Sequence, residues 1–330
     1  MKLRHLGRSV LQVTTLGLGT NSFGHRIGAE QSARVLREAL DSGINFIDTA
    51  NSYGNGRSEE FIGETVVGQR HRVVLATKVG SLLPPGRLQR GGAPRHYMRQ
   101  VDGSRSHIMQ EVELSLKRLR TDYIDLYQIH FPDPGTPIEE TLRALDELVQ
   151  QGKVRHIGCS NFSAWQTCES VWTSRTLNLS GFVTVQMEYN LLHRDIEQEG
   201  LPFCHAYQMG IIPYLPLAGG LLTGKYRAGE PAPEGSRLAT NPRLKQSYHT
   251  DHKLVLVARL SQFAADRRHT VGELAIAWLL GNPLVCSVIA GAMKPEQVAA
   301  NVKGAEWHLT PKEMLEIRAL LDGQVDPLVV

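Results

Sequence analysis

Eight short apolar runs, most of them followed by a longer segment of helical character, are the feature that most restricts how this chain can fold. Most of the runs are rich in β-branched residues and apolar almost without a break, as in strands whose two faces are both buried. They occupy residues 13–19, 44–48, 73–78, 123–130, 154–160, 182–186, 211–215 and 285–290. Eight alternations of strand and helix predict a parallel sheet covered by helices.

The segments between the runs carry the signals of helices. Apolar residues recur on one helical face from Ile108 to Leu119 and from Ile138 to Leu148. Ser or Thr followed three residues later by Glu or Gln is the pattern of a capping box at a helix start. Four such starts are predicted at Thr136, Ser163, Thr270 and Thr310. Ser58, followed by two glutamates, predicts a further helix start.

These elements predict a (β/α)8 TIM barrel that spans residues 1–330 as a single domain. A doubly wound sheet is the alternative, but residues 17–24 lack the glycine spacing of a dinucleotide-binding turn. Residues 2–12 predict an additional N-terminal β-hairpin. Two insertions rich in Gly and Pro, 80–105 and 217–250, predict long loops at the C-terminal face, where barrels of this kind carry their active sites.

Charge and composition exclude several classes of function. A net charge of +3 on 330 residues is too small to indicate nucleic acid as a partner. No apolar run approaches a membrane span and the first residues lack the apolar core of a signal peptide, so we expect a cytoplasmic protein that binds no membrane. The spacing of Cys159, Cys168, Cys204 and Cys286 does not indicate a metal site. Homo-oligomerisation is possible, but the sequence does not decide it.

Polar residues stand where several predicted strands end, and in a barrel these ends meet at one rim. Asp48 ends the second run with Tyr53 close behind, Lys78 ends the third, and His130 ends the fourth. A lysine beside a tyrosine favours the phenolate and makes the phenol a better acid. A phenol that gives its proton to an oxygen while a hydride reaches the carbon is what carbonyl reduction requires. Taken singly, each residue is more typical of a solvated or structural position than of an active site.

Further polar side chains follow the later runs. Ser160 and Asn161 end the fifth run, Gln186 the sixth and Tyr214 the seventh. Paired amide groups can hold a carboxamide, and a tyrosine can stack on a flat ring. Hydrogen bonds within loops and ordinary packing are the alternative interpretation.

Together these motifs resemble the aldo-keto reductase family. "DTANSY" is similar to its D-x-A-x-x-Y motif, and "TKVG" and "LYQIH" are similar to the segments that carry its lysine and histidine. "GKVRHIGCSNF" and "QMEYNLL" resemble two further family signatures, and all of them occur in family order. "PLAGGLLTGKY" resembles the branch that contains potassium-channel β-subunits and bacterial general-stress reductases.

The resemblance implies a nicotinamide cofactor that lies across the barrel mouth without a Rossmann domain. It implies that Tyr53 is the general acid, that Asp48 and Lys78 tune it, and that His130 helps to bind the carbonyl. Residues that match the nicotinamide site are Thr20, Asp48, Ser160, Asn161, Gln186 and Tyr214. Residues that match the pyrophosphate loop are Leu215, Pro216, Leu217, Ala218, Gly219 and Lys225, with Arg237 as an additional member. Residues that match the adenosine site are Gly291, Met293, Gln297 and Asn301.

Three departures from the family pattern bear on the cofactor. Leu215 replaces a frequent serine, Met293 replaces a polar or basic residue, and Ala300 replaces a glutamate that usually meets the adenine. Lys294 and Arg237 remain as partners for a 2′-phosphate. The sequence therefore favours NADP(H), with NAD(H) as the alternative.

The expected function is the NADP(H)-dependent reduction of a small aldehyde or ketone to an alcohol. One alternative is an NAD(P)-dependent dehydrogenase of sugars or pyridoxal-type alcohols, which would use the same residues in the oxidative direction. The other is a cofactor-binding regulatory subunit; His130 stands at a position that the channel subunits vary, which favours catalysis. Substrate choice is expected to depend on Phe23, on the C-terminal tail and on the 80–105 loop with its arginines.

Overall fold

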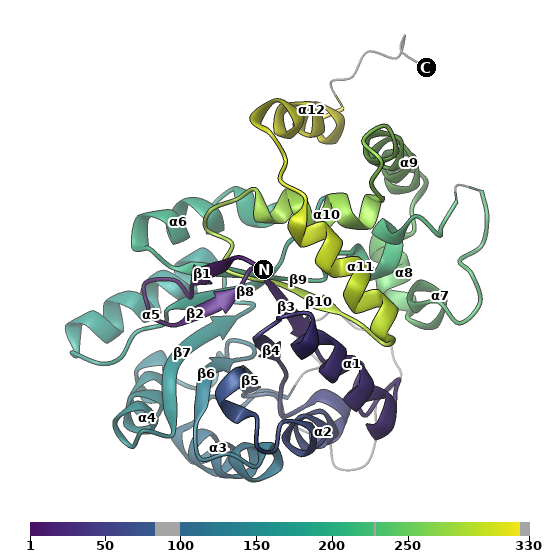
Figure 1. Ribbon diagram of the computed structural model, residues 1–330. Coiled ribbons are helices and arrows are strands. Elements are labelled where there is room, and N and C mark those ends of the chain that lie inside the picture. Colours follow the sequence, from purple (N-terminus) through teal and green to yellow (C-terminus); the bar gives the residue numbers. More distant parts are fainter. Residues whose placement is uncertain (83–99, 228, 324–330) are drawn as a thin grey trace.

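The computed structural model describes residues 1–82, 100–227 and 229–323, and its centre is a barrel of eight parallel strands (Figure 1). The strands are β3 (Leu16–Gly19), β4 (Phe46–Asp48), β5 (Val74–Val79), β6 (Ile124–Ile129), β7 (Val154–Ser160), β8 (Thr184–Glu188), β9 (Gly210–Tyr214) and β10 (Val288–Gly291). Strands that follow one another along the chain are paired from β3 to β9, and β10 returns to pair with β3. A parallel bridge between Ile211 and Val285 closes the ring. The predicted (β/α)8 barrel is therefore confirmed.

Helices surround the strands in Figure 1 and follow the alternation that the sequence predicts. They are α1 (Ala29–Asp41), α2 (Arg57–Thr65), α3 (Arg105–Leu119), α4 (Ile138–Gln150), α5 (Ala164–Thr176), α6 (Gly200–Tyr207), α7 (Arg237–Thr240), α8 (Pro242–Tyr248), α9 (Asp251–Ala265), α10 (Val271–Leu280), α11 (Pro295–Glu306) and α12 (Pro311–Leu321). Short 3₁₀ turns lie at Tyr53–Gly56, Arg70–Arg72, Asp195–Glu197 and Ala218–Thr223. The predicted 217–250 insertion thus contains α7 and α8.

The predicted N-terminal hairpin consists of β1 (Leu3–His5) and β2 (Gln12–Thr14), which pair in antiparallel fashion. The prediction of one strand over residues 13–19 is wrong in one respect, because residues 13 and 14 belong to this hairpin. The barrel strand begins only at Leu16. The residues of this run all suit a strand, so the sequence gives no sign of the boundary between two strands of different sheets.

The hairpin covers one end of the barrel. Leu6 and Val13 are fully buried and belong to the same apolar cluster as the barrel-lining Phe46 and Leu126. The side chain of Arg4 also donates three hydrogen bonds, of 2.6 to 3.0 Å, to backbone carbonyls at and beyond the end of α10. These contacts fix the hairpin over the N-terminal ends of the strands, opposite the face where barrels carry their sites.

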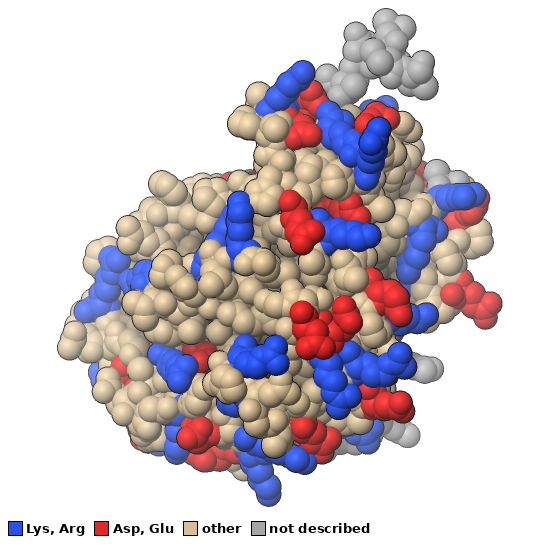
Figure 2. Space-filling view, viewed as in Figure 1, with Lys and Arg blue, Asp and Glu red and all other residues tan. Residues whose placement is uncertain are grey.

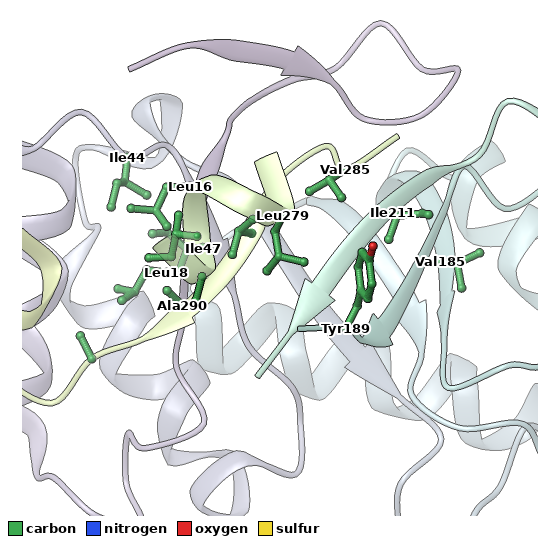
Figure 3. Close-up of a cluster of buried hydrophobic side chains, with 14 of the residues drawn as sticks. Leu16, Leu18, Ile44, Ile47, Val185, Tyr189, Ile211, Leu279, Val285 and Ala290 are labelled. Atoms are coloured by element: carbon green, nitrogen blue, oxygen red, sulfur yellow. The ribbon is translucent and has the colours of Figure 1, made fainter. Parts of the chain in front are cut away.

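A second and larger apolar cluster lies between the strands and the helices. In Figure 3, Leu16 and Leu18 of β3 lie near Ile47 of β4 and Ala290 of β10. Each of these four side chains is at most 2% exposed. Burying one aliphatic side chain of the size of leucine or isoleucine contributes about 1.5–3 kcal/mol, so this shell is a main source of the fold's stability.

Three of the four predicted capping boxes are confirmed. The hydroxyls of Ser163, Thr270 and Thr310 each accept a bond from the backbone N–H three residues on, and the reciprocal side-chain bond is also present. The prediction at Thr136 is wrong, because α4 begins two residues later and has no side-chain cap. The Thr136 hydroxyl donates instead to the Asp133 carboxylate at 2.7 Å.

The surface carries charges of both signs. Figure 2 shows basic and acidic side chains interspersed over the visible face. Within the described part of the chain, no helix is both long enough and apolar enough to cross a membrane.

Candidate active site

Alternate residues on neighbouring strands build an apolar layer inside the barrel and a polar layer directly beyond it. The apolar layer includes one residue from each of β4, β5 and β6, namely Phe46, Ala76 and Leu126. Two residues further along the same strands stand Asp48, Lys78 and Gln128, and all three are buried. Because residues i and i+2 of a strand point to the same face, these polar groups line the C-terminal end of the barrel.

Asp48 and Lys78 form a buried ion pair in the polar layer. The Lys78 ammonium donates to the two carboxylate oxygens at 2.8 and 2.7 Å and to the carbonyl oxygen of Thr49 at 2.8 Å. Lys78 is fully buried and Asp48 is 2% exposed. The side-chain amide of Gln186, from β8, donates to the same carboxylate at 2.8 Å. Three of the residues that the sequence predicts for the site therefore meet here.

Tyr53 lies beside the ammonium group of this pair. Its hydroxyl is 3.4 Å from Lys78 Nζ, and Nζ is 5.0 Å from the centre of the ring. Burial by itself lowers the pKa of Lys78, but the charge of Asp48 and the Tyr53 hydroxyl outweigh it and hold that pKa above its usual value. The lysine is therefore charged at neutral pH. The arrangement directs a permanent positive charge at a phenol oxygen.

A left-handed turn follows Tyr53. Gly54, Asn55 and Gly56 have φ values of 58°, 57° and 88°, a region that favours glycine. A Cβ atom on Gly54 would lie only 2.7 Å from the carbonyl oxygen of Phe23. Residues 54–56 thus reverse the chain, and α2 begins directly after them.

Ser58 stands inside the first turn of α2 and does not cap it, which corrects the sequence prediction. Its hydroxyl accepts a bond from Thr49 at 2.9 Å and donates to the Thr20 hydroxyl at 2.8 Å. Thr20 donates in turn to the backbone carbonyl of Asp48 at 2.9 Å. The structure therefore places Thr20 fully buried beneath the loop, where it fixes the backbone of the ion-paired aspartate.

His130 faces Tyr53 from the end of β6. Their ring centres are 5.9 Å apart and the rings are nearly perpendicular, at 77°. The Ser81 hydroxyl lies 3.2 Å from Nδ1 of His130, and the Phe131 ring stacks on the imidazole at 4.6 Å. The imidazole is thus held by Ser81 and Phe131 and faces the ring of Tyr53.

The predicted residues of β7, β8 and β9 form one hydrogen-bonded network. Asn161 donates to the His130 carbonyl at 2.8 Å and to the Ser160 hydroxyl at 3.0 Å, and it accepts from the Tyr214 hydroxyl at 2.7 Å. Ser160 donates to the carbonyl of Gln186 at 3.0 Å. Asn161 has a φ of 62°, a conformation that asparagine tolerates better than most residues.

The segment after β9 contains a run of left-handed residues. Leu215, Ala218, Gly219 and Gly220 have φ values of 54°, 49°, 67° and 102°. Backbone N–H groups in turns of this kind converge and form concave sites for anions. Pro216 and Leu217 lie within this segment. Here the N–H groups of Ala218 and Gly220 donate within the segment, to the carbonyl oxygens of Leu215 and Leu217 at 2.9 and 2.8 Å. The predicted pyrophosphate loop therefore consists of tight left-handed turns, and anion binding by it stays a prediction.

Cationic side chains lie on and near this insertion. Arg237, at the start of α7, is half-buried and makes no side-chain hydrogen bond or ion pair with any described residue. Burial, together with the nearby positive charge of Arg26, lowers the pKa of Arg237. Lys225 is exposed and has no ion pair within the described residues. The charge of the Glu188 carboxylate opposes the lowering of the Arg237 pKa, although Glu188 forms no ion pair with Arg237.

The predicted adenosine residues lie at the end of β10 and along the start of α11. Gly291 ends β10, and the side-chain oxygen of Gln297 accepts from the N–H groups of Met293 and Lys294 at 2.7 and 3.2 Å. Asn301, one turn further on, is 8% exposed, and its side chain makes no hydrogen bond to a described residue. A largely buried amide without a partner fits a polar ligand group.

Comparison with known proteins identifies the family. A model described as the aldo/keto reductase family matches residues 15–322. The chain belongs to the aldo/keto reductase family.

Individual relatives match almost the whole chain. A probable voltage-gated potassium channel subunit beta from Oryza sativa subsp. japonica is 36% identical over 98% of both chains. The aldo-keto reductase YhdN of Bacillus subtilis is 36% identical over 99% of this chain and 96% of its own length. The L-glyceraldehyde 3-phosphate reductase of Escherichia coli K12 is 33% identical over 99% of this chain and 94% of its own length. The holo form of the aldo-keto reductase AKR11C1 from Bacillus halodurans superposes with a TM-score of 0.77 at 32% identity, covering 99% of each chain.

Sequence reasoning about this aldo/keto reductase missed three buried polar residues close to the site. Gln128 lies in the polar layer with its amide 3.5 Å from the Asp48 carboxylate. Ser81 contacts the imidazole of His130, and Asn51 stands in the loop between Asp48 and Tyr53. A signal existed for Gln128, because it interrupts the apolar run "YIDLYQIH". Ser81 and Asn51 fall in polar segments where no pattern distinguishes them.

Other features of this aldo/keto reductase lie apart from the site. A mostly apolar pocket of about 210 Å³ lies between α5 and α6 and contains none of the predicted site residues. Among the described residues, no group of His, Cys, Asp and Glu is placed to hold a metal ion. The residues of the 80–105 loop to which the sequence assigned substrate choice lie outside the described residues: Arg87, Arg90, Arg95, Tyr97 and Arg99.

Proposed function

We propose that this aldo/keto reductase uses NADP(H) to reduce a small aldehyde or ketone to an alcohol, with Tyr53 as the general acid. The observation that carries the proposal is the position of the Lys78 ammonium, which is buried, paired with Asp48 and 3.4 Å from the Tyr53 hydroxyl. Within water-excluded surroundings such a charge favours the phenolate over the phenol, so Tyr53 releases its proton more readily.

The chain's own residues act on the carbonyl oxygen. Tyr53 transfers its hydroxyl proton to that oxygen, and the negative charge left on the phenolate is balanced by Lys78. His130 donates a hydrogen bond to the same oxygen and orients the carbonyl in front of the phenol. The reduced nicotinamide, when bound, supplies the hydride that the carbonyl carbon accepts. The products are an alcohol and the oxidised cofactor.

Three features of the described residues support a dinucleotide at the barrel mouth. The left-handed run that begins at Leu215 contains residues that match the family's pyrophosphate loop, and Arg237 is half-buried and forms no ion pair with a described residue. The side chain of Asn301 is largely buried without a hydrogen-bond partner. The network of Asn161 and Gln186 would hold the carboxamide, and Tyr214 would stack on the ring.

The choice of NADP(H) over NAD(H) rests on the cations. Arg237 and Lys294 have no ion pairs among the described residues and are available to a 2′-phosphate. Titration of the protein with NADPH and NADH, followed by quenching of tryptophan fluorescence, is expected to show tighter binding of NADPH. Equal affinities would remove the case for a phosphate site.

Two other functions are compatible with this fold. A cofactor-binding regulatory subunit is suggested by the names of relatives from Oryza sativa and Arabidopsis thaliana, but such a role does not require the set of Asp48, Tyr53, Lys78 and His130. A dehydrogenase of sugars or pyridoxal-type alcohols would use the same groups in reverse, with the Tyr53 phenolate as the base. A screen of carbonyls and alcohols against both cofactors separates these three functions.

The role of Tyr53 is tested by Tyr53→Phe, which removes the proton and leaves the ring. Turnover is expected to fall by about 10²–10⁴-fold, the usual contribution of a general acid, while NADPH binding stays nearly unchanged. Tyr123→Phe is the matched control, because Tyr123 packs between the guanidinium groups of Arg70 and Arg155 and not in the polar layer. Full activity of Tyr53→Phe would refute the assignment.

A further inference from the structure

A second group of buried charges lies between α2 and α3 and next to the proposed catalytic residues, and nothing in the mechanism above uses it. Glu59 of α2 has a fully buried side chain, and Glu111 and Arg118 of α3 are 12% and 16% exposed at their side chains. Charged groups in such positions are costly unless they are paired. Their arrangement therefore needs an explanation.

Arg118 joins the two carboxylates. Its Nε donates to Glu59 at 2.6 Å, and its Nη2 lies 3.4 Å from Glu111. The planar guanidinium group presents several N–H donors in fixed directions, so one side chain can hold two acids at a set separation. Burial raises the pKa of Glu59, and the charge and hydrogen bonds of Arg118 oppose that rise. The two acids are thus tied to a single cation.

Each carboxylate also holds one element of the site. The other oxygen of Glu59 accepts a 2.6 Å bond from the hydroxyl of Thr77, the residue directly before Lys78. Glu111 accepts a 2.8 Å bond from the side-chain amide of Asn51, which lies between Asp48 and Tyr53. One arm of the cluster therefore reaches the strand of the lysine, and the other reaches the loop of the tyrosine.

The turn after Tyr53 is packed against the same arginine. A Cβ atom on Gly56 would lie 2.9 Å from Cδ of Arg118, so a side chain there would displace the arginine or the turn. Gly63 of α2 similarly leaves room for the backbone of α3, because its Cβ would lie 2.4 Å from the carbonyl oxygen of Arg118. Two glycines thus allow the close approach that puts Arg118 beneath the loop.

We propose that Arg118, through Glu59 and Glu111, is a positioning residue that fixes the distance between the Lys78 ammonium and the Tyr53 hydroxyl. Arg118 acts on the two indirectly, through the bonds of Glu59 to Thr77 and of Glu111 to Asn51. The inference rests on the proposed function, because it assigns a purpose to that distance. Backbone hydrogen bonds such as that from the Asn51 N–H to the Lys78 carbonyl oxygen, at 3.2 Å, also join the tyrosine loop to the lysine strand. Loss of either arm leaves those bonds in place but removes the side-chain contacts that set how closely the Tyr53 hydroxyl approaches Lys78.

The most direct test removes the hydrogen bond between Asn51 and Glu111 and leaves the buried ion pairs intact. Asn51→Ala removes the bond to Glu111 without removing a charge. A misplacement of about 1 Å at a reacting group can cost about 10²-fold in rate, so kcat is expected to fall by about that factor while NADPH affinity is retained. Arg118→Lys keeps the charge but cannot hold both acids in the same geometry, and it is expected to give a loss of the same kind.

A matched control is available on the same pair of helices. Arg120 and Glu64 also join α3 to α2, at 2.9 Å, but their side chains are about half exposed, at 54% and 50%. Arg120→Met removes an α2–α3 ion pair that does not reach the site, and its kcat is expected to equal that of the wild type. A kcat of Asn51→Ala as high as that of this control would overturn the proposal, even if Arg118→Lys did not fold.

A second measurement does not depend on turnover. The absorbance change at 295 nm on phenolate formation, taken as wild type minus Tyr53→Phe, reports the titration of Tyr53. In the Asn51→Ala background the same difference is expected to appear at higher pH, because the ammonium group is held less closely. An unchanged titration would overturn the positioning role. If the wild type reduced no carbonyl compound, the proposed function would be wrong. The titration of Tyr53 would still show whether Arg118 and Asn51 position the Lys78 ammonium next to the tyrosine.

Discussion

The Asp48–Lys78 pair predicts a large loss of stability when only one partner is changed. Asp48→Asn keeps the size of the side chain and an oxygen that can accept from Gln186, but it leaves the fully buried Lys78 ammonium without a counter-ion. Leaving one member of a buried pair uncompensated costs about 3–5 kcal/mol. For a chain of 330 residues the entropy of unfolding scales to about 0.7 kcal/mol/K, so Tm is expected to fall by about 4–7 °C.

The assay is urea-induced unfolding followed by tryptophan fluorescence, with refolding measured in parallel to show that the transition is reversible. The decisive comparison is the double variant Asp48→Asn with Lys78→Met. It leaves no buried charge at this position, so it is expected to recover most of the free energy of unfolding that the single variant loses. A single variant within about 1 kcal/mol of the wild type, or a double variant less stable than the single one, would refute the reasoning.

Two further predictions concern the turn after Tyr53 and the free thiols. In the same unfolding assay, Gly56→Ala is expected to lose more stability than Gly68→Ala. Both glycines have a left-handed φ, of 88° and 74°. A Cβ atom at Gly56 would meet the side chain of Arg118, whereas the space around Gly68 is open. Equal losses would contradict the close packing. Burial raises the pKa of Cys204 to about 12, so its thiol stays protonated at pH 8, and a thiol-specific reagent is expected to modify the half-buried Cys168 first. Rapid modification of Cys204 in the folded protein, seen by peptide mass spectrometry, would contradict this burial.

The barrel could be predicted because the pattern of apolar residues that marks each strand and helix lies within that element's own sequence. Strands buried on both faces leave nearly unbroken apolar runs, and parallel strands in a barrel bring their C-terminal ends to one rim. That is why Asp48, Lys78 and Gln186 were expected together and are found hydrogen-bonded. The same local reasoning joined residues 13 and 14 to the barrel strand, because an apolar run does not show where one sheet ends and another begins.

Contacts between elements could not be predicted in the same way. Thr136 has the sequence of a capping box, yet a nearby carboxylate, Asp133, competes for its hydroxyl. Ser58 has the sequence of a helix cap, yet it is drawn into the hydrogen bonds beneath Thr20. The roles of Arg118 and Asn51 depend on how α3 packs under a loop that lies far from it in the sequence. Periodicity and spacing describe single elements and carry no information about such pairs.

The N-terminal hairpin closes one end of the barrel and leaves only the C-terminal rim accessible. Leu6 and Val13 pack beneath the buried layer of Phe46, Ala76 and Leu126, so a ligand can reach the polar layer only from the opposite rim. The same geometry matters at the bench. A tether attached at Met1 holds the molecule by its closed end, so a protein immobilised in this way presents its open rim to the solution.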